Sequence, residues 1–113
     1  MVGERDLAKL LESLNPKLYP ERFSFATEPS DDWFALVRED EGVTVIRPDT
    51  VGDWARISLA VHSSLGAVGL TAELSRRLAD AGISANIVAA LRHDHIFVPW
   101  DRREEALDLL RSA

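Results

Sequence analysis

The chain has 113 residues, a length that suits one domain able to bury a core without disulfides or metals. Its net charge of −6, with 13 basic and 19 acidic residues, argues against a nucleic-acid partner, because phosphates are neutralised by Lys and Arg. It contains no cysteine, which excludes disulfides and thiolate chemistry and suits the cytoplasm, where we expect the protein to be. It also contains no apolar run of about 18 residues, so we expect no membrane partner.

The N-terminal part predicts one helix and then three strands. A leucine stripe with i, i+3, i+4, i+7 spacing predicts a helix over residues 4–14, which ends at Asn15-Pro16. Alternating apolar residues predict strands over residues 22–28, 33–38 and 42–47. The last two form a hairpin across an acidic, glycine-containing turn, and residues 48–54 link it to the central unit.

Residues 57–82 predict a strand, a loop and a helix. Ile57, Leu59 and Val61 alternate with small or polar residues, as in a half-buried strand. The period becomes helical from about residue 68, and the sequence places these residues on one face: Ala67, Thr71, Leu74, Leu78 and Ala81. Gly82 stands where a left-handed residue ends a helix.

The last part predicts two antiparallel strands and a final helix. The first of these strands is predicted to place Ile87, Ala89 and Leu91 on one face. A turn at His93-Asp94 leads into the second strand, over residues 95–98. Asp101 is the predicted N-cap of the final helix, with Glu104 as its capping-box partner.

This order of elements predicts an α+β fold. Residues 55–113 match a ferredoxin-like βαββα unit that lacks its terminal strand, and residues 1–54 add an N-terminal helix and a three-stranded antiparallel extension to the same two-layer sandwich. The missing strand leaves a sheet edge that either an N-terminal strand or a second copy of the chain can fill. We expect an N-terminal strand to fill it, and a homodimer to form through the outer edge or the helical face.

Several segments resemble the ACT domain, and most closely the short stand-alone bacterial ACT-domain proteins. They are VGLTAELSRRLADAGISANIVA (68–89), HDHIFVP (93–99), HSSL (62–65) and REDEGVTVI (38–46). Val68 stands before Gly69, where proline is usual in that family. The resemblance implies an ACT-type, ferredoxin-like regulatory fold in which paired domains bind an amino acid or a similar small carboxylate at the first strand–helix loop.

The resemblance also implies which residues bind the ligand. They are His62, Ser63, Ser64, Leu65, Val68, Gly69, Leu70, Thr71, Asn86, Ile87 and Asp94. The residues themselves favour part of this set, because a helix N-terminus offers unpaired amides to a carboxylate and glycines let a ligand reach the backbone. Each residue also has a structural explanation: Ser64 as a helix cap, Gly66 and Gly69 as turn residues, and Asn86 as a loop tie.

The three histidines are the other notable chemical groups. His93 and His95 are two residues apart and could bind a metal together with His62 or Asp94. The spacing lacks the further ligands of a zinc motif, so a turn Asp flanked by hydrogen-bonded histidines is the favoured interpretation. A third reading places these residues beside the ligand site of a partner subunit. We predict no metal and no cofactor.

Catalytic motifs are absent from the sequence. A set made of Ser63 or Ser64 with His62 and Asp94 can be written down, but no G-x-S-x-G elbow, P-loop or G-x-G-x-x-G accompanies it. We therefore predict no catalytic residues and a protein that is not an enzyme. A structural dimerisation module without a ligand is the alternative to a small-molecule sensor.

Overall fold

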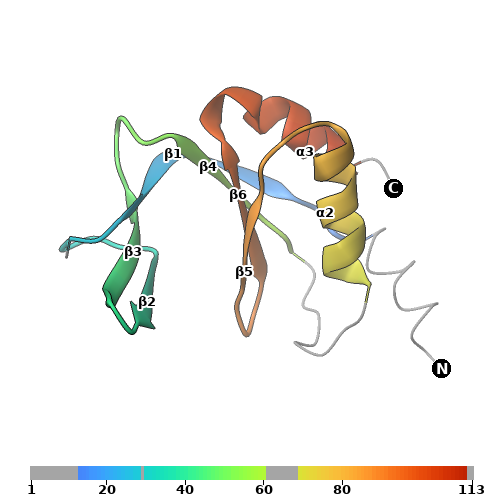
Figure 1. Cartoon of the computed structure of the whole chain (residues 1–113). Helices are drawn as coiled ribbons and strands as arrows, with labels where there is room; N and C mark the ends of the chain where they lie inside the picture. The colour runs from blue at the N-terminus through green and yellow to red at the C-terminus, as the bar shows by residue number, and fades with distance from the viewer. Residues whose placement is uncertain (1–12, 29, 61–68, 112–113) are drawn as a thin grey trace.

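The structure, a computed structural model, describes residues 13–28, 30–60 and 69–111. The helix predicted over residues 4–14 lies almost entirely outside them. Figure 1 shows the elements, whose bounds are β1 (Lys17–Ala26), β2 (Ala35–Glu39), β3 (Gly42–Pro48), β4 (Trp54–Ser58), α2 (Leu70–Asp80), β5 (Asn86–Ala89), β6 (Asp94–Pro99), the 3-10 helix η1 (Trp100–Arg102) and α3 (Arg103–Arg111).

The strands form one six-stranded antiparallel sheet in the order β2-β3-β1-β4-β6-β5. β1 pairs with β4 where a ferredoxin-like unit would place its terminal strand, so the expectation that an N-terminal strand fills that edge is confirmed. An irregularity in the ladder between Leu18 and Arg22 interrupts the pairing of β1 with β4. Beyond it, β1 pairs with β3 as well and joins the two halves of the sheet.

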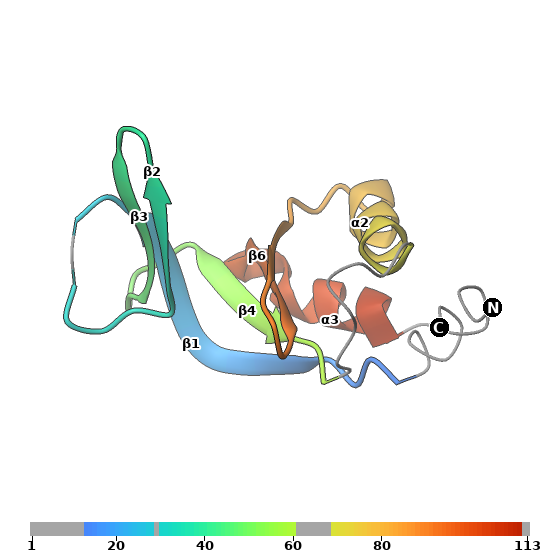
Figure 2. The same ribbon diagram turned by 90° about the horizontal axis from the view of Figure 1, so that it is seen from below.

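The helices cover only part of this sheet. In Figure 2, α2 and α3 lie on one side of the half that contains β4, β5 and β6, while the β2–β3 hairpin extends away from them. The α+β class is therefore confirmed, but the layout differs from the predicted two-layer sandwich with an N-terminal helix. In the described residues the helical layer consists of α2, η1 and α3 and does not reach the hairpin.

The main core lies between the helices and the sheet. α2 buries Leu70, Leu74 and Leu78, which lie one turn apart on a single face. The prediction that Thr71 shares this face is wrong: the helix starts at Leu70, and Thr71 is exposed. Further members of this core come from the sheet and from α3, namely Ala55, Ile57, Ile96, Val98, Ala106, Leu107 and Leu110.

A second, aromatic cluster lies on the sheet face that turns away from the helices. Phe23 and Phe97 are buried there with their ring centroids 5.4 Å apart in an edge-to-face arrangement. Phe34, just before β2, contacts both rings. This cluster connects the β2–β3 end of the sheet to β6.

Several predicted boundaries are corrected. The strand expected from Ile57 begins at Trp54 and ends at Ser58, because its partners on β1 and β6 extend over that range. Leu91 is 67 % exposed, since β5 ends at Ala89 and the chain bends after it. Asp94 belongs to β6 rather than to the turn.

The helix ends are also informative. Gly82 has a φ of 73°, so the left-handed residue predicted after α2 is confirmed. Asp101 lies inside η1 rather than at an N-cap, and η1 begins without a side-chain cap hydrogen bond. No helix within the described residues is long and apolar enough to cross a lipid bilayer.

Candidate functional site

The start of α2 offers backbone amides at a helix N-terminus. Gly69 is its N-cap residue and adopts a φ of 100°, which glycine tolerates without strain. Its carbonyl accepts the amide hydrogen of Glu73 at 2.9 Å, and no side chain of the described residues caps the helix. The amides that precede Glu73 have no acceptor within an α-helix, so this end can donate hydrogen bonds to an anion.

The residues predicted to surround this end are only partly described. His62, Ser63, Ser64, Leu65 and Val68 lie outside the described residues, and their role stays a prediction. Two of the described members, Leu70 and Thr71, differ in burial. Leu70 is buried in the main core, whereas Thr71 is exposed in the first turn of α2.

The three predicted residues on the β5–β6 hairpin do not gather at one place, because Asp94 lies at the opposite end of the ladder from Asn86 and Ile87. Asn86 is exposed and opposite Phe97, and Ile87 packs against the main core. Asp94 pairs with Ala89 at the other end of this ladder, and its carbonyl accepts the amide hydrogen of Leu59 at 3.0 Å. Burial raises the pKa of the Asp94 carboxyl. Of the three, Asp94 is therefore tied to the segment that leads out of β4 toward α2.

A polar pair absent from the predicted set joins β4 to β6. Ser58 lies opposite His95 in the ladder, and its Oγ is 2.7 Å from Nδ1 of His95. Both side chains are on the sheet face that turns away from the helices, because Ile57 and Ile96 take the helix side. The alternation of Trp54, Arg56 and Ser58 with Ala55 and Ile57 was the signal that the sequence offered for this polar face.

A cavity of about 250 Å³ opens beside this pair. It is lined by Asn15, Lys17, Tyr19, Ser58, Leu59, Ala60, His93 and His95. Lys17 enters because it pairs with Ser58 across the β1–β4 ladder. The cavity thus combines residues from three strands that are distant in sequence.

The environment of His95 keeps its imidazole neutral at pH 7. Burial, the charge of Arg56 and the neighbouring His93 lower the pKa of His95 to about 4. Nδ1 of His93 lies 3.0 Å from the carbonyl oxygen of Leu59, and the two imidazole rings are 6.3 Å apart. Within residues 13–28, 30–60 and 69–111 no group of three or more metal-ligating side chains is gathered.

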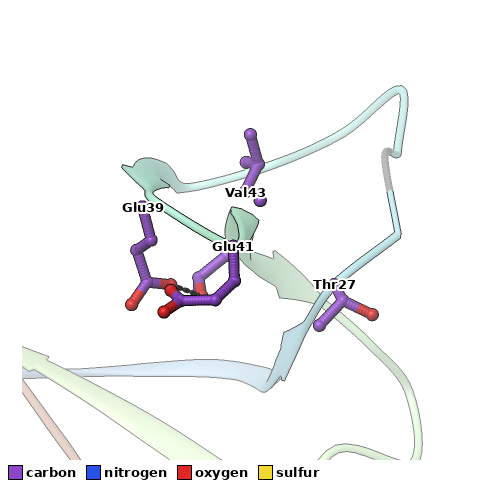
Figure 3. Close-up of a pocket in the computed structure, with 6 residues that line it drawn as sticks. Thr27, Glu39, Glu41 and Val43 are labelled. Carbon is purple, nitrogen blue, oxygen red and sulfur yellow. Dashed lines mark hydrogen bonds between the residues drawn. The ribbon is translucent and has the colours of Figure 1, made fainter.

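A second hollow, of about 190 Å³, lies on the β2–β3 hairpin and is acidic. Figure 3 shows the carboxyl groups of Glu39 and Glu41 on the same side of the hairpin, with Thr27 and Val43 nearby. The hydroxyl of Thr44 donates a hydrogen bond to Glu39. These carboxylates are exposed and at least one already has a partner, so the hollow is explained by a solvated turn.

Comparison with known proteins gives a consistent result. Models of the ACT domain match residues 50–112 and residues 2–62. The crystal structure of a Vibrio cholerae protein of unknown function, described as a possible transport protein, is 36 % identical and superposes with a TM-score of 0.79, covering 97 % of this chain and 96 % of that one. An Agrobacterium tumefaciens protein shares the fold with 18 % identity and a TM-score of 0.54, over 74 % of this chain and 68 % of its own. No match is found among curated proteins.

Proposed function

Because this chain belongs to the ACT domain family, we propose that it is a regulatory protein that binds an amino acid or a similar small carboxylate at the loop between β4 and α2. ACT domains are generally small-molecule-binding regulatory domains rather than catalytic ones. The observation that carries this proposal is the N-terminus of α2, where Gly69 starts the helix and no side chain of the described residues caps it. The amides of the first turn, which have no acceptor within the helix, and the positive end of the helix dipole suit a carboxylate.

The same proposal divides the chain into an ACT-like half, residues 1–54, and an ACT core, residues 55–113. The two family matches, which overlap only over residues 50–62, support this division. The single continuous sheet supports treating both halves as one compact unit. Asp94, hydrogen-bonded to Leu59 through its backbone, is the described residue of β6 that we assign to the ligand site.

We further propose that the protein is a homodimer, because ACT domains commonly oligomerise. The proposed location is the cytoplasm. Exposed apolar side chains on the β2–β3 hairpin and next to it support the homodimer. We call them the hairpin patch: Phe25 of β1, Trp33 before β2, Leu36, Val37 and Val43. Leu36 and Val37 are adjacent in β2 and therefore lie on opposite faces of its edge. β2 is one of the two outer strands of the sheet, so its edge and this patch offer a surface to a second copy. The same patch favours the second candidate function, a dimerisation module that binds no ligand.

A thermal-shift screen separates the two candidates. The wild-type protein is melted with each of the twenty amino acids and with a set of small carboxylates, at several protein concentrations. A ligand that binds the folded state raises the melting temperature according to RT ln(1 + [L]/Kd). A rise with one ligand at fixed protein concentration supports the sensor. A melting temperature that responds only to protein concentration supports the dimerisation module.

A further inference from the structure

The cavity beside Ser58 and His95 is positively charged on an acidic protein. The chain carries a net charge of −6, yet the described residues that line the cavity include Lys17 and no Asp or Glu. The Lys17 ammonium lies 4.6 Å from the ring centroid of Tyr19. The Arg56 guanidinium lies over the same ring at 3.6 Å. Lys17 therefore brings a positive charge to the cavity wall, and Arg56, which does not line the cavity, contacts the same tyrosine ring.

The guanidinium of Arg56 forms no ion pair with a carboxylate within the described residues. Its guanidinium lies among rings, with Phe34 at 4.6 Å and Phe23 at 5.7 Å in addition to Tyr19. Its Nε is buried and has no hydrogen-bond partner in the described part of the chain. Burial lowers the pKa of Arg56, while the charge of Glu21 acts in the opposite direction. A half-buried cation such as Arg56 is stabilised by an anion placed nearby.

The Ser58–His95 pair supplies a neutral donor to the same space. The imidazole of His95 is uncharged at pH 7, so one of its nitrogens carries the ring hydrogen. With that hydrogen on Nδ1, His95 donates to Ser58, and the Ser58 hydroxyl is free to donate its own hydrogen to a ligand. Neither residue then carries a negative charge that would repel an anion.

From these features we propose that this cavity is a binding site for a small organic carboxylate, distinct from the ligand proposed at the α2 end of the β4–α2 loop. Lys17 and Ser58 hold the carboxylate, and the ring of Tyr19 lies against the apolar part of the ligand. The volume of about 250 Å³ is below the range of roughly 300–1,000 Å³ found for drug-sized ligands, and it suits a molecule of the size of benzoate.

The test is a titration of the ¹⁵N-labelled protein with benzoate, followed by NMR, with benzamide as the uncharged isostere. We expect saturable shifts of the amides of Lys17, Ser58, Ala60 and His95. Lys17→Gln should weaken benzoate binding about tenfold, since it removes a charge-assisted hydrogen bond. Benzamide should bind the wild-type protein about tenfold more weakly than benzoate. Arg111→Gln, which removes an exposed cation at the end of α3, should leave binding unchanged.

A second variant and the shift pattern make the outcome decisive. Ser58→Ala should weaken benzoate binding, and its spectrum shows whether the fold is retained. Equal binding of benzoate and benzamide, or equal binding to Lys17→Gln and wild type, overturns the proposal. The absence of any shift also overturns the cavity proposal, and it does not affect the separate proposal of a ligand at the start of α2. Shifts confined to Gly69–Ala72 overturn the cavity site and support the loop site.

Discussion

Lys17 lies directly opposite Ser58 in the antiparallel β1–β4 ladder. Through this pairing a strand of the N-terminal half completes the sheet of the C-terminal half. The two regions that match ACT domain models, residues 2–62 and 50–112, therefore contribute strands to one sheet. The pairing also places a lysine beside the Ser58–His95 pair. The continuity of the sheet and the cavity beside Ser58 thus both depend on the pairing of β1 with β4.

Gly52 should be intolerant of substitution, because the backbone of β1 passes close to it. A Cβ at this position would lie 2.3 Å from the carbonyl oxygen of Phe23, so the backbone must shift to admit it. We expect Gly52→Ala to lower the free energy of unfolding by more than about 2 kcal/mol. Urea denaturation measures the loss. Thr50→Ala, at an exposed position two residues earlier, should change the free energy of unfolding by less than about 0.5 kcal/mol.

The inward face of α2 is tested by a pair of substitutions one turn apart. Leu74 is 1 % exposed in the main core, so Leu74→Ala should destabilise the protein by about 2–5 kcal/mol. Thr71→Ala, on the exposed side, should cost less than about 0.5 kcal/mol. Similar losses for the two variants in urea denaturation would restore the helical face predicted from the sequence.

Stability should fall with falling pH because of His95. The pKa of His95 is lowered to about 4 in the folded protein, whereas its ordinary value is 6.5. As the pH falls below 6.5, the unfolded chain therefore protonates this imidazole before the folded protein does. The free energy of unfolding should therefore decrease between about pH 6.5 and about pH 4, and protonation of His95 should lower it no further below pH 4. In urea denaturation at a series of pH values, His95→Gln should reduce the slope of the free energy of unfolding against pH over this range.

The neighbours of His95 define the control. Ser58, Arg56 and His93 face it, and burial is a larger cause of its lowered pKa than Arg56 or His93. Asp94 acts with the opposite sign, because burial raises its pKa and so favours the folded state at low pH. We expect His93→Gln to keep the slope between pH 6.5 and 4. A slope that is unchanged in His95→Gln contradicts the assignment.

The hairpin patch should control self-association. Leu36 is 51 % exposed and Val37 47 % exposed on the outer strand β2. We expect Leu36→Asp combined with Val37→Asp to convert a dimer into a monomer in analytical ultracentrifugation at micromolar concentration. Leu91→Asp changes an even more exposed leucine on the β5–β6 turn and should leave the dimer intact. Dissociation by the Leu91 variant alone would move the interface to that turn.

Local signals in the sequence predicted much of the fold. Apolar alternation located the β2–β3 hairpin, and Gly82 marked the end of α2, because both depend on neighbouring residues. The start of β4 at Trp54 depends on pairing with β1, whose residues are far away in sequence, and was missed. Thr71 was misplaced since a helical face drawn from residue 67 is rotated relative to one that starts at Leu70.

The candidate site was only partly accessible from the sequence. Local chemistry placed Gly69 at the start of the helix, where the structure has it as the N-cap residue, and its ligand role stays a prediction. The cavity beside Ser58 was not, since Lys17, Ser58 and His95 come from three strands and meet only through the register of the sheet. Reading that register from the sequence would have required the strand pairing in advance.

Isothermal titration calorimetry of the best ligand from the amino-acid and carboxylate screen tests the sensing function most directly. Gly69→Ala forces a side chain into a left-handed residue at the proposed site, and Gly82→Ala does the same at the other end of α2. We predict saturable heat with the wild-type protein, at least about tenfold weaker binding by the Gly69 variant, and unchanged binding by the Gly82 variant. No heat with any ligand, or equal binding by both variants, would contradict a ligand held at the start of α2.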